Sequence, residues 1–445
     1  MTVAPSRLAA NHWPGLDEVP TGPRAVVAAR IARRIFTAAV NRLDVTVELA
    51  ATASRPAQRI GRGGPVAVVH RPDEFFARVG AQALIGFGEA YLVGAWDAED
   101  LGGFLTVLAA EMSDLVPRPL QRLRALYVAR PPRFHRNTED QTRGNIAHHY
   151  DLSNDMFELF LDSTLSYSSA LFDTGHTPAS DEVGALLRAG DPRLGAPGGT
   201  APTREDLAEA QGRKLERLLD RTGVTEGTRV LEIGSGWGEL AIRAARRGAH
   251  VTTITLSSEQ QALARERVDA AGMSARVDVE LLDYRAVRGT FDVVLSVEMI
   301  EAVGWQYWPT YLETIERVLV PGGRAGIQAI TMPHDRMLAT KHTYTWINKY
   351  IFPGGFLPSV QVLDELSRAH TDLRLTDRLS MGLHYAETLR LWDEAFAGAR
   401  EEVLGLGFDE TFLRMWHFYL EYSRAGFASG YLDVNQLVLT RGGTP

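Results

Sequence analysis

Two carboxylates stand among apolar and aromatic residues in the stretch VEMIEAVGWQYW, residues 297–308. Glu298 and Glu301 share one face if this stretch begins a helix, and they diverge if it is a corner between a strand and a helix. A buried carboxylate costs several kcal/mol unless hydrogen bonds or an opposite charge compensate for it. Such a group could stabilise a cation or accept a proton. The alternative for Glu301 is a carboxylate at a helix N-terminus that faces solvent.

A glycine-rich loop in VLEIGSGWGELAI follows an apolar strand and precedes a helix, with glycines at 234, 236 and 238. Gly234, Gly236 and Gly238 let the backbone turn tightly and approach a ligand. The spacing is GxGxG rather than the GxGxxG of dinucleotide sites, and Glu232 lies inside the strand. Asp283, in LLDYR, ends a later strand, where its carboxylate could accept a hydrogen bond from an adenine amino group. These features favour S-adenosylmethionine over a dinucleotide.

The elements that would position these residues alternate between strand and helix from residue 203 onward. This alternation predicts an α/β domain with helices on both faces of a mostly parallel sheet. Its first helix starts after Thr203, with Asp206 as a capping-box partner, and ends at Gly223. The second strand, HVTTITL, has no acid at its tip for ribose hydroxyls, so Thr255 and Gln260 are expected to serve there.

The chain is expected to hold two domains. Residues 1–24 are predicted to be flexible, residues 25–136 to form a smaller and mainly helical domain, and residues 137–445 to form the catalytic domain. Residues 25–50 begin with helical spacing and end with strand-like alternation, 65–70 read as a strand, and 72–84 as a helix. The Gly- and Pro-rich residues 174–203 predict an exposed flexible loop.

Composition excludes several classes of protein and site. The absence of cysteine excludes disulfides and thiolate metal sites. No signal peptide and no run of 18 apolar residues is found, so a cytoplasmic protein is expected. No recognised metal-ligand spacing is found in two groups of candidate ligands, His148 with His149, and His334 with Asp335 and His342. No metal is therefore predicted.

Charge is distributed unevenly along the chain. Residues 1–150 contain 18 Arg, no Lys and 14 acidic residues, a net charge of +4, whereas the remainder carries −12. This excess, with the basic and aromatic segment 122–136, favours peripheral binding of the N-terminal domain to phospholipid at the inner face of the plasma membrane. The alternative is that the arginines pair with local acids on a solvated face.

Several motifs together resemble the cyclopropane-fatty-acid synthase family, from about residue 70 to residue 430. They are NIAHHYDLSNDMFELFLDSTLSYSSALF (145–172), LEIGSGWG, TLSSEQ, DYR, MIEAVG, INKYIFPGGFLPS (347–359) and HYAETLRLW (384–392). The resemblance implies a Rossmann-like methyltransferase domain with a seven-stranded sheet. It also implies that S-adenosylmethionine is bound by Tyr167, Ser168, Thr255 and Gln260, and Tyr284 of the DYR motif is placed with them.

The resemblance also implies an unusual reaction, in which a methyl group passes from S-adenosylmethionine to an unactivated cis double bond of an acyl chain. An alkene is a poor nucleophile, so the transition state resembles a carbocation. Aromatic faces and one anion in a dry pocket would stabilise it. The rings expected there are those of GWQYWPTY, Trp346, Tyr385 and Trp392.

In this family a bound bicarbonate is the implied proton acceptor. The residues that match its ligands are Glu301, Tyr385 and the backbone positions Ser169 and Ile330. Glu298 receives no such role and is expected to cap or pair locally.

Three positions depart from the ring-forming pattern. Ser169 replaces a Cys, Ala302 replaces the His after the motif Glu, and Gln328 replaces a His that helps to hold bicarbonate. Glutamine donates a hydrogen bond but does not accept a proton at neutral pH. The sequence thus resembles the actinobacterial subgroup of the tuberculostearic acid pathway, which makes 10-methylene chains that a separate flavoprotein reduces. Cyclopropane formation on the same oleoyl phospholipid is the alternative.

Two other classes of function are disfavoured by the sequence. A non-catalytic lipid-binding protein on a methyltransferase fold is disfavoured by the intact glycine loop, Glu301 and Tyr385. A nucleic-acid methyltransferase would need an NPPY-type site or a catalytic cysteine, and the acidic catalytic domain argues against a nucleic-acid partner. A homo-oligomer is expected.

Overall fold

The computed structural model describes residues 13, 15–111, 154–173 and 202–443. The chain divides into two compact units. The first contains residues 1–131, 343–351 and 396–431, and the second contains 132–342, 352–395 and 432–445. The first unit therefore takes two segments from the C-terminal half of the chain.

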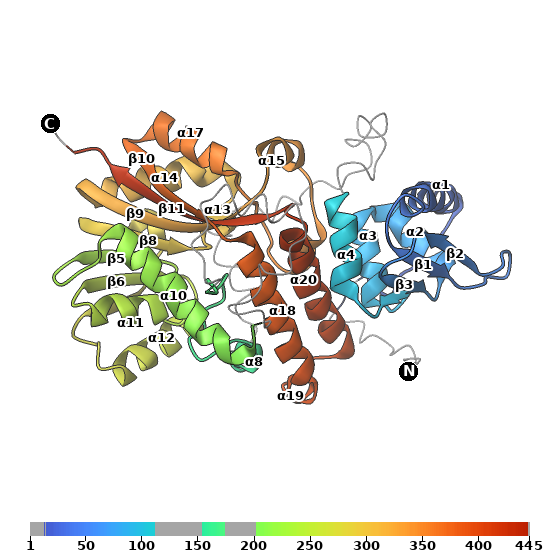
Figure 1. Ribbon diagram of the computed structural model, residues 1–445, viewed down its shortest axis with the longest axis horizontal. Coiled ribbons are helices and arrows are strands. Elements are labelled where there is room, and N and C mark those ends of the chain that lie inside the picture. Colours follow the sequence, from blue (N-terminus) through green and yellow to red (C-terminus); the bar gives the residue numbers. More distant parts are fainter. Residues whose placement is uncertain (1–12, 14, 112–153, 174–201, 444–445) are drawn as a thin grey trace. The chain divides into compact units, whose positions relative to one another are not determined.

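The second unit is built on a seven-stranded sheet with the order β10-β11-β9-β8-β5-β6-β7 (Figure 1). Strands β5 to β9 pair with one another in parallel, and β11 is antiparallel to both β9 and β10. The strands are β5 (Arg229–Ile233), β6 (His250–Thr255), β7 (Val277–Leu281), β8 (Phe291–Val297), β9 (Leu319–Thr331), β10 (Leu373–Ser380) and β11 (Asp433–Arg441). This confirms the predicted mostly parallel sheet.

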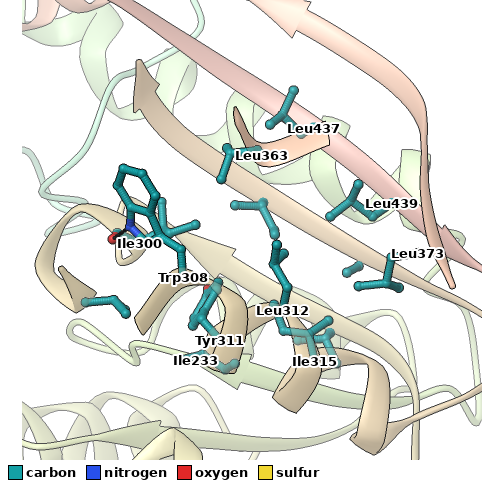
Figure 2. Packing of buried hydrophobic residues seen from close by; sticks show 14 of the residues in the cluster. Ile233, Ile300, Trp308, Tyr311, Leu312, Ile315, Leu363, Leu373, Leu437 and Leu439 are labelled. Carbon is teal, nitrogen blue, oxygen red and sulfur yellow. Dashed lines mark hydrogen bonds between the residues drawn. The ribbon is translucent and has the colours of Figure 1, made fainter. Parts of the chain in front are cut away.

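Two apolar cores hold helices against this sheet. One core contains side chains of α10 (Arg204–Thr222), α11 (Glu239–Arg246) and α12 (Ser258–Ala270). The other contains side chains of α13 (Ile300–Val303), α14 (Trp308–Val318) and α17 (Val360–His370), and Figure 2 shows part of it. Because central strands are buried on both faces, they read as nearly continuous apolar runs in the sequence.

Local sequence signals fix the ends of α10. Thr203 donates from its backbone N–H and its hydroxyl to Asp206 Oδ2, at 2.8 and 2.9 Å, which confirms the capping box. Gly223 ends the helix with a φ of +78°. The other helical segments of this unit are α8 (Asn154–Phe160), η4 (Tyr284–Ala286), η5 (Trp305–Tyr307), α15 (His334–Thr340) and most of α18 (Gly382–Gly398).

The first unit combines helices with a small sheet of order β2-β1-β3-β4. Its strands are β1 (Thr46–Leu49), β2 (Gln58–Gly61), β3 (Val66–Val69) and β4 (Trp96–Ala98). Its helices are α1 (Pro23–Val40), α2 (Pro72–Gln82), α3 (Leu84–Leu92), α4 (Leu101–Ala110), α16 (Trp346–Tyr350), α19 (Arg400–Gly405) and α20 (Glu410–Ala428). The predicted helix and strand within 25–50, the strand at 65–70 and the helix from 72 are all confirmed.

Polar contacts tie the segment 343–351 to the first unit. Glu89 accepts a hydrogen bond from the Tyr350 hydroxyl at 3.0 Å and forms an ion pair with Lys349. None of the described helices is long and apolar enough to cross a bilayer. Several predicted features lie outside the described residues, namely segment 122–136, His148, His149 and nearly all of loop 174–203.

Candidate active site

The glycine-rich loop joins β5 to α11 in a conformation that requires its glycines. Gly234, Gly236 and Gly238 have φ values of +96°, +48° and +91°. A Cβ placed on Gly234 would lie 2.5 Å from Met299 Cγ, so that position is closed. A Cβ on Gly236 would meet no atom within 4 Å, so the loop borders open space there. This is the geometry expected where a backbone approaches a ligand.

The two residues expected to replace a ribose-binding acid are paired. Thr255, at the end of β6, donates from its hydroxyl to Gln260 Oε1 at 2.9 Å. The backbone N–H of Gln260 donates to Ser257 Oγ, which caps α12. Because its oxygen accepts from Thr255, the amide of Gln260 has a defined orientation, with the NH₂ group left as a donor.

Asp283 and Tyr284 lie at the end of β7, as the sequence predicted. Asp283 accepts from the Arg285 guanidinium with both oxygens, at 2.8 and 2.6 Å, and also caps η4. The Oδ1 atom accepts a second hydrogen bond, from the Arg285 backbone N–H at 3.0 Å, so Arg285 fixes the orientation of this carboxylate. Tyr284 packs edge-on against Tyr311, and burial raises its pKa to about 12.

An aromatic group forms around Trp392 of α18. Tyr167 stacks on Trp392 with ring centroids 5.2 Å apart, and Tyr385 meets Trp392 edge-on at 6.0 Å. Phe157 contacts Tyr167 edge-on at 5.1 Å and also contacts Trp237 of the glycine-rich loop at 5.1 Å. The group thus links a predicted cofactor residue, Tyr167, to a predicted catalytic residue, Tyr385.

Other rings expected in the cavity have different positions. Trp308 and Tyr311 belong to the apolar core in Figure 2, where their polar atoms bond to Ile300 O and Ser296 Oγ. The prediction that these two rings line a substrate cavity is therefore wrong, and they support the sheet instead. Trp346 belongs to the first unit, where it packs on Phe418 with ring centroids 4.8 Å apart.

Glu298 follows the last residue of β8 and has an unusual backbone conformation. Its φ is +52°, in the left-handed region, and its N–H donates to the backbone oxygen of Gln328 at 2.8 Å. Its Oε1 accepts from Ser169 N–H at 3.0 Å and from the Gln328 amide at 2.8 Å. The Tyr385 side chain is a further hydrogen-bond partner. Burial raises the pKa of Glu298, while these hydrogen bonds oppose the rise.

Glu301 occupies the first turn of α13 and is only 9% exposed, so the solvent-facing alternative does not hold. Its carboxylate accepts a hydrogen bond from the backbone N–H of Ile330 through Oε1. Its Oε2 is buried and has no hydrogen-bond partner among the described residues. Burial, followed by the nearby charge of Glu298, raises the pKa of Glu301 to about 8.

A chain of side-chain amides orients Gln328 toward Glu298. Gln328 Oε1 accepts from Gln436 Nε2 at 3.1 Å, and Gln436 Oε1 accepts from Arg217 at 2.7 Å. Since each amide oxygen is occupied by a donor, the NH₂ group of Gln328 is directed to the carboxylate. The sequence analysis missed Gln436, because its proximity to Gln328 depends on strand pairing between β9 and β11. It also missed Arg217, which bonds to Gln436 from α10.

Lys214 of α10 is a further residue that the sequence analysis missed. It is fully buried, and its ammonium donates to Ser168 Oγ at 2.7 Å. Burial lowers its pKa to about 8, and the charges of Glu298 and Asp162 oppose that shift. The available signal was a lysine at a position of α10 that faces the core, in a chain with only three lysines.

The structure therefore brings all five predicted catalytic positions into one cluster. Glu298 contacts Ser169, Tyr385 and Gln328, and Glu301 contacts Ile330. The anion that joins three of these positions is Glu298, which had been given no role. Ser168, a predicted cofactor residue, lies beside this cluster through Lys214.

Comparisons with known proteins agree with this geometry. A family model described as mycolic acid cyclopropane synthetase matches residues 137–437. The chain is 49% identical, over 98% of its length and 96% of the relative, to tuberculostearic acid methyltransferase UfaA1 of Mycobacterium tuberculosis. It is 30% identical, over 87% of its length and 91% of the relative, to cyclopropane-fatty-acyl-phospholipid synthase of Escherichia coli.

Solved structures give the same result. The crystal structure of mycolic acid cyclopropane synthase CmaA1 complexed with SAH and CTAB matches with a TM-score of 0.56 and 27% identity. That match covers 70% of this chain and 99% of the other. On the family model and the nearly full-length relatives, the chain belongs to the mycolic acid cyclopropane synthetase family of S-adenosylmethionine-dependent lipid methyltransferases.

Proposed function

We propose that the protein transfers a methyl group from S-adenosylmethionine to the cis double bond of an oleoyl chain in a phospholipid, giving a 10-methylene branch. The observation that carries this proposal is the 49% identity to a tuberculostearic acid methyltransferase across 98% of the chain. The product would be the precursor of a 10-methyl fatty acid, which a flavoprotein reductase would form from it by reducing the methylene group.

The residues present suit S-adenosylmethionine, which supplies an electrophilic methyl group when it is bound. Open space at Gly236 leaves room for the cofactor beside the loop. The NH₂ group of Gln260 could donate to ribose hydroxyls, and Asp283 could accept from the adenine amino group. The Tyr167 ring, held against Trp392, offers its π-electrons to a sulfonium.

The cluster next to Tyr167 suits a reaction that develops positive charge on a hydrocarbon. Tyr385 meets the edge of Trp392 and also bonds to Glu298, so aromatic rings and a buried carboxylate adjoin one another. In surroundings of low polarity a fixed anion stabilises a cation more strongly than it does in water. The same carboxylate cluster could receive the proton that ends the reaction.

Bicarbonate, which the resemblance implies as the proton acceptor, does not suit this arrangement. The donors expected to hold it are Ser169 N–H, Gln328, Tyr385 and Ile330 N–H. Glu298 occupies the first three, and Glu301 occupies the fourth. A second anion placed beside two buried carboxylates would meet electrostatic repulsion, and the donors named here already bond to those carboxylates.

Cyclopropane formation on the same chain is the second candidate, and the 30% identity to cyclopropane-fatty-acyl-phospholipid synthase favours it. Expression in bacteria that lack both products, followed by mass spectrometry of the fatty acids before and after mild hydrogenation, separates the two. A methylene branch becomes a saturated methyl branch, whereas a ring largely persists. Ring-containing chains as the main product would refute the proposal.

The substrate places the protein at a phospholipid surface, and we assign this contact to α1. Val26, Val27 and Ile31 of this helix are 49%, 54% and 53% exposed. Exposed Arg24, Arg30 and Arg34 accompany them, and α1 contains no acidic residue. An exposed surface that is both apolar and basic suits an anionic lipid headgroup layer.

A further inference from the structure

Glu298 presents a carboxylate where a small anion would otherwise be held. Its Oε1 receives hydrogen bonds from Ser169 N–H at 3.0 Å and from Gln328 at 2.8 Å, and Tyr385 is a third partner. These groups come from three separate parts of the chain, namely the loop after α8, strand β9 and helix α18. Convergence of three donors on one carboxylate is the pattern of a built anion site.

The backbone conformation of Glu298 is strained. Glu298 is one of three non-glycine residues with positive φ in the described part of the chain. A left-handed glutamate is strained by about 1 kcal/mol or more. The conformation persists because the backbone N–H bonds to the oxygen of Gln328 while the side chain bonds to the amide of the same residue. Gln328 therefore holds Glu298 at both ends.

Glu301 and Lys214, the charged neighbours of Glu298, determine which of the two carboxylates is ionised. The Glu301 carboxylate is hydrogen-bonded only by backbone N–H groups, and its buried Oε2 has no partner among the described residues, whereas Glu298 has three partners and the attraction of Lys214. Two adjacent buried carboxylates favour sharing a single proton. The proton is best placed on Glu301, and the negative charge on Glu298.

We propose that the Glu298 carboxylate is the built-in general base of the reaction and makes bound bicarbonate unnecessary. This inference rests on the proposed function, since it concerns the proton that methyl transfer to an alkene must release. It assigns a catalytic role to a residue of this chain that replaces an external anion.

Glu298 acts at the last step of the proposed reaction, after methyl transfer and a hydride shift. When the methyl group bonds to one alkene carbon, the C–S bond breaks and the neighbouring carbon becomes cationic. A hydride shift moves the positive charge to the carbon that carries the new methyl group. A methyl C–H bond then gives its electron pair to a new C=C bond, and its proton passes to Glu298. The resulting carboxylic acid later releases this proton to solvent.

Removing the Glu298 side chain should recreate a site for an external anion. In Glu298→Gly the donors Ser169, Gln328 and Tyr385 lose their partner, and glycine also suits the positive φ. We expect wild-type turnover to be unchanged, within twofold, between CO₂-depleted buffer and buffer with added bicarbonate. Glu298→Gly should fall at least 100-fold in depleted buffer and recover at least tenfold with bicarbonate or formate.

A binding measurement makes the test independent of the lipid product. Carbon-13 NMR with labelled bicarbonate should show no bound signal in the wild-type protein and a saturable one in Glu298→Gly. Ala83→Gly, which relieves another positive φ in the first unit, is the control and should behave like the wild type in both measurements. If the lipid product differs from the proposed methylene branch but wild type binds no bicarbonate, the proposed function fails while the built-in anion stands.

Three outcomes would overturn the inference. They are saturable bicarbonate binding by the wild-type protein, loss of wild-type turnover in CO₂-depleted buffer, and turnover of Glu298→Gln within tenfold of wild type. Glutamine keeps the size of the side chain, so this third variant separates the loss of a base from the loss of packing.

Discussion

Gln328 and Gln436 lie directly opposite each other in the register of β9 and β11, and their side-chain amides are hydrogen-bonded at 3.1 Å. This bond makes Gln436 a positioning residue, because it fixes which end of the Gln328 amide faces Glu298. Gln436→Glu removes the donor, so Gln328 can rotate its oxygen toward the Glu298 carboxylate. We expect kcat to fall at least tenfold with the KM for S-adenosylmethionine within threefold, measured by steady-state kinetics. Unchanged kcat in Gln436→Glu would contradict this role. Gln436→Asn keeps the amide on a side chain that is one methylene shorter, so it should be more active than Gln436→Glu and less active than wild type.

Gly236→Val should abolish S-adenosylmethionine binding, because its side chain would enter the open space that we assign to the cofactor. Isothermal titration calorimetry should show at least a 100-fold loss of affinity. Gly272→Val is the matched control, since Gly272 also has positive φ and open space but lies after α12. Equal loss of affinity in both variants would show that backbone strain, and not the space at Gly236, causes the effect.

Glu301→Gln should reduce turnover at least 100-fold while cofactor affinity stays within threefold. The carboxylic acid of Glu301 lies beside Glu298, and glutamine cannot share a proton with that carboxylate. Turnover on oleoyl phospholipid vesicles and calorimetry with S-adenosylmethionine measure the two quantities. Glu313→Gln, an exposed change on α14, is the control. Substantial activity in Glu301→Gln would exclude Glu301 from the reaction.

His384 should make stability fall in acid. Its Nδ1 accepts from the backbone N–H of Phe172 at 3.2 Å, and burial lowers its pKa to about 4. Between pH 6.5 and about 4 the unfolded chain binds a proton that the folded state does not, so the free energy of unfolding decreases as pH falls. The contribution reaches about 3 kcal/mol.

Urea unfolding at pH 7 and pH 4.5 tests this expectation. His384→Asn, whose Oδ1 can replace Nδ1 as the acceptor, should lose less stability over this interval than wild type. His250→Asn, at an exposed position, should match the wild-type loss. The same pH dependence in His384→Asn as in wild type would contradict the assignment.

The exposed face of α1 should control binding to membranes. Replacing Val27 and Ile31 together by Glu removes apolar contact and adds charge that an anionic surface repels. Vesicle sedimentation with phosphatidylglycerol should show at least a tenfold loss of affinity, with turnover on detergent-dispersed phospholipid unchanged. Leu406→Glu, at another exposed apolar position in the first unit, should bind like wild type. If the double variant still binds vesicles normally, α1 is not the contact.

The elements of the catalytic unit could be predicted from sequence because local signals specify them. Thr203, Asp206 and Gly223 mark both ends of α10, and the apolar strands alternate with amphipathic helices. The role of Glu298 could not be predicted in this way. A positive φ at the end of β8 turns its side chain to donors that lie 129 residues earlier and 30 residues later in the chain. Such convergence depends on tertiary structure.

The positions of the aromatic rings were also only partly predictable from the sequence. The sequence grouped the rings of GWQYWPTY with Tyr385 and Trp392, since all are close to motifs of the site. Trp308 and Tyr311 instead lie on the core face of α14, where helical spacing places them with Leu312 and Ile315. Helical periodicity within 308–318 was the available signal, and it outweighs proximity to a motif.

The migration of hydrogen during the reaction tests the proposed carbocation and its methylene exit most directly. Purified protein, S-adenosylmethionine and phospholipid carrying oleoyl chains deuterated at carbon 10 would be incubated, and the products would be located by mass spectrometry of chain fragments. We expect a 10-methylene chain whose deuterium has moved to carbon 9, as a hydride shift requires. Deuterium that remains on carbon 10 within a cyclopropane ring, or the absence of any methylated chain, would contradict the proposed reaction.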